Sequence, residues 1–247
     1  MLHPFFQTKV FSLIVWNLGW IVLGATWLGP LPTWAMNSFA AHMALHMAIV
    51  AIAAPLLSIG ASGRRYDPVR KWPRIFSPVS ASVGELILVW TWHTPRLHHW
   101  ARFDTIGFVG EQGMFLGAGL WMWLSAFGGT RPRSMDRAAA GVIGLLLTSM
   151  HMTLLGALLA LSNRVLFMHH TGTLFLNELT DQHLGGTIML LVGGVAFLAG
   201  GLWLVCELLV HDGITLEKRF KTRVHGGRTI DGREFTEAKI RTDRNFP

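Results

Sequence analysis

Two histidines stand four residues apart in the segment AHMALHM at 41–47. On a helix, His42 and His46 project from one face with about 6 Å of axial rise between them, which suits two ligands of one ion. Met43 and Met47 repeat this spacing about 100° further round the helix. Imidazole together with thioether favours copper, above all Cu(I), over magnesium or calcium. Two alternatives stay open, namely that the methionines are packing residues and that the histidines bond a neighbouring helix.

Three further histidines are candidate ligands of the same ion. His151 stands in the polar stretch TSMHMT at 148–153, and we expect it to close the site from across a helix bundle unless it only bonds another helix. His93 ends an apolar run, and Pro95 stops the helix just beyond it. His183 opens another run in LTDQHLGG at 179–186, where Asp181 can orient an imidazole by a hydrogen bond and the two glycines permit close helix approach.

Two acidic residues, Glu85 and Glu111, lie within apolar runs. A carboxylate in such a place must find a partner or stay protonated, so each is a candidate partner of a histidine or a candidate proton carrier. We assign Glu111, its neighbour Gln112 and Asp181 to the residues that support the metal ligands by hydrogen bonds.

The elements that must position these side chains are membrane spans. The chain has 247 residues, of which 51% are hydrophobic and 14% charged, against about 25% charged in an ordinary soluble domain. Apolar runs of about twenty residues are typical of membrane-spanning helices. Six candidates are residues 10–28, 37–60, 78–94, 106–127, 138–161 and 184–210, the third being short. We therefore predict an all-α, polytopic membrane bundle of about six transmembrane helices over 1–210, followed by a charged cytoplasmic tail over 211–247.

The basic residues separate by side of the membrane. Six crossings place 18 Lys and Arg on the side of the termini and 3 on the other, so the positive-inside rule puts both termini in the cytoplasm. Without the third span, the basic loop 61–77 and the basic tail would lie on opposite sides. The formal charge of +7 then indicates a membrane surface rather than nucleic acid. A cleaved signal peptide at the first span stays open as an alternative.

Most of the histidines fall on the outer side of this topology, in the outer half of the membrane or in outer loops. These are His42, His46, His93, His98, His99, His151, His169, His170 and His183. The adjacent pairs at 98–99 and 169–170 are predicted to be solvated surface or metal-capture residues rather than parts of the central site. The single cysteine excludes a disulfide framework and any multi-thiolate cluster within one copy of the chain.

Several motifs, in this order along the chain, resemble the polytopic CtaG family of cytochrome c oxidase assembly proteins, in the branch found beside caa-type oxidases. They are HMALHM at 42–47, AAPLL at 53–57, WHTP at 92–95, MHMTLLGALL at 150–159 and DQHLGG at 181–186. The resemblance implies a multi-pass protein of the bacterial inner membrane that helps to assemble the oxidase by handling copper for its subunits. It falls on His42, His46, Pro55, His93, Pro95, His151, Asp181, Gln182, Gly185 and Gly186.

The chain departs from the family pattern at two places. The family tends to carry an acid followed by histidine where this chain has Glu111 and Gln112, and Asp-Gln-Gln where this chain has His183 as the third residue. We hypothesise that a histidine has moved to a facing helix, which predicts a contact between positions 112 and 183. Family members also often have seven spans, where we count six.

The leading functional hypothesis is a copper metallochaperone that passes the ion to the apo-oxidase, with the oxidase subunits and the lipid bilayer as partners. No catalytic nucleophile is evident, so we expect no enzymatic activity. A haem b-binding electron carrier is the alternative, because His46 and His151 could make an axial pair. A metal permease is disfavoured because the inner halves of the spans carry few ligands. The sequence leaves open whether the site is shared between two copies of the chain.

Overall fold

The computed structural model describes residues 9–65, 67–129, 134–167 and 176–210, and within these ranges it is helical and contains no β-strand. The helices in chain order are α1 (Lys9–Leu28), α2 (Leu31–Ala35), α3 (Phe39–Met47), a π-helix (Ala48–Ala53), α4 (Ala54–Ala61), α5 (Pro68–Lys71), α6 (Pro78–Trp92), α7 (Pro95–Phe103), α8 (Thr105–Phe127), α9 (Met135–Ala160), α10 (Glu178–Ile188) and a second π-helix (Met189–Gly193). The last of these continues as helix over 194–210. The predicted all-α class is confirmed.

Internal contacts divide the chain into two units, Met1–Leu204 and Val205–Pro247. All the candidate site residues described below belong to the first unit. Of the second unit, only the end of the last helix falls within the described residues. The predicted tail, together with His169 and His170, lies outside them.

Each of the six predicted spans coincides with a helix or an unbroken series of helices. Four of these are long and apolar enough to cross a membrane, namely Lys9–Leu28, Phe39–Ala61, Met135–Ala160 and Glu178–Val210. The remaining two are α6, with 15 residues, and α8, with 23 residues. The chain is therefore a helical membrane protein, and the count of six crossings stays a prediction.

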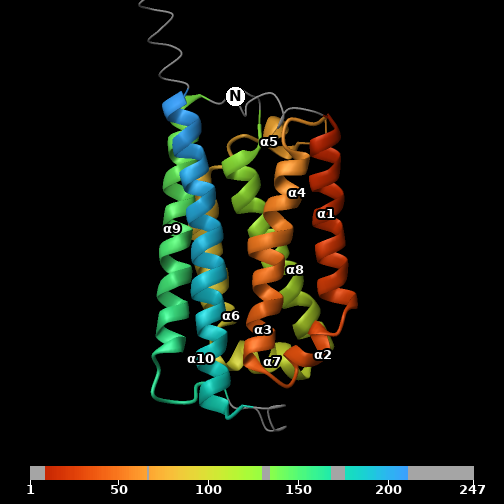
Figure 1. Cartoon of the computed structure of the whole chain (residues 1–247), viewed down its shortest axis with the longest axis vertical. Coiled ribbons are helices and arrows are strands. Elements are labelled where there is room, and N and C mark those ends of the chain that lie inside the picture. The colour runs from red at the N-terminus through yellow and green to blue at the C-terminus, as the bar shows by residue number, and fades with distance from the viewer. Residues whose placement is uncertain (1–8, 66, 130–133, 168–175, 211–247) are drawn as a thin grey trace, which may run out of the picture. The chain divides into compact units, whose positions relative to one another are not determined.

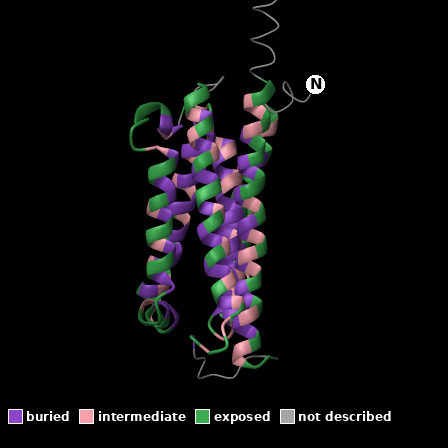
Figure 2. Cartoon of the chain, turned by 90° about the vertical axis from the view of Figure 1, so that its left-hand side faces the viewer, coloured by how far each residue is buried: buried purple, intermediate pink, exposed green. Residues whose placement is uncertain are grey.

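Large apolar side chains cover much of the outside of the first unit, as the exposed faces in Figure 2 indicate. Examples are Ile21, Val109, Met150 and Val195, each more than three-fifths exposed. Apolar surface on this scale would be an aggregation hazard in water, whereas it matches the interior of a lipid bilayer.

The short helices lie at the two ends of the bundle (Figure 1). Helices α2 and α7 lie at the end where α3 and α10 begin, and α5 lies at the opposite end. In the predicted topology the end with α2 and α7 is the outer one. Reporter fusions after residue 35 should therefore score as periplasmic and a fusion after residue 70 as cytoplasmic. A periplasmic score at residue 70 would overturn this topology.

The helix that follows α3 is widened by a π-turn at Ala48–Ala53, which the apolar pattern did not predict. The N–H of Ala54 bonds a carbonyl five residues back, so the carbonyl of Val50 faces Pro55, which has no N–H to donate. The indole Nε1 of Trp123 on α8 donates to this oxygen at 2.9 Å. A buried carbonyl that the backbone cannot satisfy is thus satisfied by a side chain. Such π-bulges are frequent at functional sites.

Helices α9 and α10 approach each other closely through two glycines. A Cβ atom built on Gly186 would lie 2.5 Å from the backbone nitrogen of Ala160 and 2.7 Å from the carbonyl oxygen of Gly156. A side chain at this position would have to push backbone aside, so only glycine fits. The close approach predicted for this helix is confirmed, and it fixes α10 against α9 while the other side of α10 packs on α3.

Candidate metal centre

Two histidines and one glutamate meet in the interior of the bundle. His42 and His46 come from successive turns of α3, and Glu111 comes from α8. All three side chains are buried, and one ligand atom from each lies within 4.8 Å of the others. The carboxylate lies 3.3 Å from Nε2 of His42 and 3.5 Å from Nε2 of His46. The predicted pairing of the two histidines at one site is consistent with this geometry, and Glu111 joins them directly.

The two imidazoles point the same nitrogen at each other. Nε2 of His42 and Nε2 of His46 are 2.8 Å apart, so a hydrogen bond between them requires one of these nitrogens to carry a proton. Nδ1 of His46 has no hydrogen-bond partner among the described residues, and Phe115 stacks on this ring at 4.0 Å between centroids. Once that proton is lost, the two Nε2 lone pairs and the carboxylate form a donor set that a cation can bind.

A second donor pair, His93 and Met43, lies beside this cluster. Nδ1 of His93 donates to the carbonyl of Val89 at 2.7 Å, which leaves the lone pair on Nε2. That nitrogen lies 3.5 Å from the sulfur of Met43. The ring centroid of His93 lies 6.3 Å from that of His46. An imidazole and a thioether therefore lie beside the cluster. Both residues were predicted from the sequence as candidate metal ligands.

His98 belongs to the same group, although the sequence analysis assigned it to an outer loop. It comes from α7, is almost fully buried, and its ring centroid lies 4.7 Å from that of His42. Nε2 of His98 has no hydrogen-bond partner among the described residues. Burial, and then the neighbouring His42, lower the pKa of the His98 imidazole well below its usual 6.5. The ring is therefore neutral at physiological pH and can act as a donor to a metal.

The sequence signal for His98 is the amphipathic helix PRLHHWARF at 95–103. Because adjacent residues on a helix point about 100° apart, only one of two neighbouring histidines can face the bundle. His99 takes the other direction, and its ring lies tilted against that of Phe103, whose side chain is exposed, with the centroids 4.5 Å apart. Hydropathy alone does not tell which of the two histidines is turned inward.

Asp181 holds the start of α3 rather than a histidine ring. Its carboxylate accepts the N–H of Phe39 at 2.6 Å, the N–H of Ala40 at 3.3 Å and the hydroxyl of Ser38 at 2.7 Å. Free N–H groups at a helix N-terminus favour a carboxylate. The residue thus positions the helix that carries His42 and His46, and it does so from α10. The expectation that Asp181 bonds an imidazole is therefore wrong.

Replacing Asp181 by alanine is expected to destabilise the protein by about 1–3 kcal/mol, because buried N–H groups lose a charged acceptor. The same change should weaken metal binding, because α3 can then move. Asp181→Asn, which keeps one acceptor oxygen, should be milder. Thermal unfolding in detergent and metal titration measure the two effects. The control is Ser134→Ala, which removes the N-cap of α9. Because α9 carries neither His42 nor His46, this variant should leave metal binding unchanged. Equal effects of Asp181→Ala and Ser134→Ala on metal binding would contradict this role.

His151 and Met47 were predicted as ligands, and neither belongs to the group. His151 is not among the residues whose ligand atoms converge within 4.8 Å of one another. Both ring nitrogens of His151 have no hydrogen-bond partner among the described residues. The sulfur of Met47 points towards the second π-helix, since a Cβ built on Gly193 would lie 3.2 Å from it.

Gln112 and His183, the pair predicted to face each other, have different partners. The amide of Gln112 donates to Glu111 at 3.3 Å, which agrees with the supporting role that the sequence analysis gave it. Nε2 of His183 bonds the carbonyl of Ser162 at 2.8 Å, where it ties down the turn after α9. Their contacts therefore give no support to the idea of a histidine exchanged between the two positions.

Glu85 lies in a separate buried polar group between α6 and α9. The hydroxyl of Thr148 is within hydrogen-bond distance of both Ser82, at 2.9 Å, and the Glu85 carboxyl, at 3.3 Å. The other carboxyl oxygen of Glu85 has no partner among the described residues. His151 follows Thr148 by one turn of α9. Of the two roles left open for Glu85, the contacts favour a structural hydrogen bond between these helices.

The chain matches a family of known proteins. Residues 7–210 match the model of a family described as the cytochrome c oxidase caa3 assembly factor (Caa3_CtaG). Searches of curated proteins and of solved structures give no match. The family resemblance drawn from the sequence motifs is confirmed.

Proposed function

Since this chain belongs to the family of cytochrome c oxidase caa3 assembly factors, we propose that it holds a copper ion at His42, His46 and Glu111 and delivers the ion to the apo-oxidase. The observation that carries this proposal is the convergence of two Nε2 atoms and a carboxylate within 4.8 Å. An assembly factor that hands over a metal must bind it without altering it. The ion is therefore cargo, and we propose no catalytic step.

The nature of the donors supports copper over other divalent metals. Two imidazoles and a carboxylate alone would also suit zinc. The thioether of Met43 and the imidazole of His93, which are 3.5 Å apart beside the cluster, add soft donors that favour copper and especially Cu(I). We propose that these two residues and His98 complete or exchange the ligands when the ion is loaded or released.

The place of the cluster supports delivery on the outer side of the bacterial inner membrane. His42 and His46 both belong to α3, a helix of nine residues. This helix begins at the end of the bundle that also carries α2 and α7 (Figure 1). In the predicted topology this end faces the periplasm. The copper would thus be held in the outer half of the membrane, within reach of oxidase subunits that are exposed there.

Haem b remains the competing ligand, and the geometry argues against it. A 2.8 Å separation between the Nε2 atoms of His42 and His46 leaves no space for a porphyrin between these two rings. A visible spectrum of the purified protein tests this directly, because bound haem gives an intense Soret band and Cu(I) does not absorb there.

Metal analysis of the full chain, purified in detergent and loaded under reducing conditions, tests the proposal. We expect one copper ion per chain, retained in competition with equimolar zinc, and transfer of this copper to apo-oxidase in a mixed-detergent assay. A protein that takes up zinc and no copper, or that shows a Soret band instead, would overturn the copper proposal. Copper that binds and is never transferred would overturn the delivery part of the proposal and leave copper storage.

A further inference from the structure

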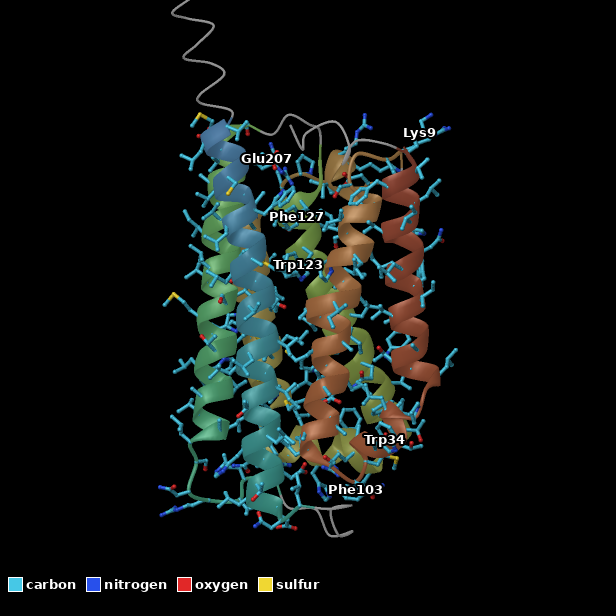
Figure 3. The ribbon with its side chains drawn as sticks, in the orientation of Figure 1. Lys9, Trp34, Phe103, Trp123, Phe127 and Glu207 are labelled. Atoms are coloured by element: carbon cyan, nitrogen blue, oxygen red, sulfur yellow. The ribbon has the colours of Figure 1, made fainter. Side chains whose placement is uncertain are left out.

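A cavity of about 940 Å³ lies between α1, α4, α8 and the helix at 194–204, and none of its lining residues belongs to the metal cluster. Its walls are mainly apolar, and four aromatic side chains line it, namely Phe11, Trp123, Phe127 and Trp203. Figure 3 shows Trp123 and Phe127 on the same half of the first unit as Lys9, the first residue of α1. This is the end that the predicted topology places in the cytoplasm.

Four cations stand at the mouth of the cavity. Lys9 comes from α1, and Arg64, Arg65 and Arg70 come from the segment between α4 and α5 and from α5 itself. The Nε–H of Arg64 donates to the hydroxyl of Ser12 at 3.0 Å. In the described part of the chain, none of the four forms an ion pair with a carboxylate. Their charge is therefore available to a ligand that brings a negative charge of its own.

The segment that carries the arginines is fixed in place by a buried acid. The carboxylate of Asp67 accepts the N–H groups of Gly63 at 3.0 Å, Val69 at 3.0 Å and Gly129 at 2.7 Å. These bonds tie the segment to the residues that follow α8. They also occupy Asp67, the acid closest to the arginines in sequence, with backbone donors. The cations are thus held over the apolar cavity by the fold itself.

We propose that this cavity binds an anionic phospholipid of the cytoplasmic leaflet, with its phosphate at the four cations and an acyl chain against the aromatic wall. An apolar hollow beneath cations that have no carboxylate partner among the described residues matches an amphiphile that has a negative head. A free phosphate would leave the apolar wall unused, and a zwitterionic lipid would offset its own phosphate with a choline. Basic residues at the cytoplasmic face of membrane proteins attract anionic lipids for the same electrostatic reason.

The test uses the full chain in detergent, with thermal unfolding and native mass spectrometry as readouts. Phosphatidylglycerol should raise the melting temperature at concentrations at least tenfold lower than phosphatidylcholine or inorganic phosphate, and lipid adducts should survive in the spectrometer. The double variant Arg65→Gln/Arg70→Gln should lose this preference for phosphatidylglycerol. Arg96→Gln, which removes a cation at the opposite end in α7, is the matched control and should keep it.

A second variant addresses the apolar part of the site. Ala196 lines the cavity, and Ala196→Trp should fill it and reduce lipid adducts while leaving copper binding intact. Equal stabilisation by phosphatidylcholine, or by phosphate alone, would overturn the proposal. A Soret band in the wild-type protein that disappears in Ala196→Trp would also overturn it, by assigning the cavity to haem. None of these outcomes depends on the metal cluster, so this proposal and the proposed copper site can fail separately.

Discussion

Alanine in place of His46 is expected to abolish copper binding, with a loss of affinity of more than about 100-fold. Loss of a group that only orients a metal ligand already costs about 10–100-fold, and His46 supplies an imidazole to the cluster itself. His42→Ala should behave alike, because its Nε2 lies as close to Glu111. The measurement is competition with a Cu(I) chelator of known affinity, under reducing conditions, on monodisperse protein.

Two other histidines serve as controls in the same experiment. His151→Ala should retain copper, since His151 does not belong to the cluster, and His183→Ala should retain it because His183 only ties down the turn at Ser162. If His151→Ala loses copper while His46→Ala keeps it, the cluster on α3 is not the site and the ion binds at His151 instead.

Replacing Gly186 by alanine is expected to cause a large loss of stability for the addition of a single methyl group. The added Cβ would meet backbone atoms of Ala160 and Gly156 at 2.5 and 2.7 Å, and backbone cannot rotate away as a side chain can. Overpacking of this kind costs about 1–3 kcal/mol or more. At about 2–4 °C per kcal/mol for a chain of this size, the melting temperature should fall by several degrees, and Gly186→Leu should fail to fold.

Gly113 offers a matched control on α8, because a Cβ built there meets nothing within 4 Å. Gly113→Ala should leave stability unchanged or raise it by up to about 1 kcal/mol, through the better helix propensity of alanine. Equal melting temperatures for Gly186→Ala and Gly113→Ala would contradict the close packing of α9 against α10 at Gly186.

The positions of the helices could be predicted from sequence because the apolar runs are long and the loops between them short. Even the third run, with Glu85 in it, is helical over Pro78–Trp92. The π-turn at Ala48–Ala53 could not be predicted in this way. It depends on the donor that Trp123 supplies from another helix, and a hydropathy pattern contains no information on which helices are neighbours.

The candidate site could be predicted in part for the same reason. Spacing along one helix places His42 and His46 together, since both belong to α3. The third member depends on which helix lies opposite, and α8 brings the Glu111 carboxylate within 3.5 Å of both Nε2 atoms, where the sequence analysis expected His151. Asp181 could be recognised as a residue of importance, whereas its actual partners, the first N–H groups of α3, follow only from the packing.

The hydrogen bond from the indole of Trp123 to the carbonyl of Val50 has a consequence for how this protein can change over time. Pro55 removes the backbone donor that this carbonyl would otherwise use, so loss of the indole alone strands a buried acceptor. A lineage that replaces Pro55 with an ordinary residue regains the backbone donor and is released from the need for tryptophan. The two positions should therefore vary together, and a substitution at Trp123 should be tolerated far better in chains that have already lost the proline.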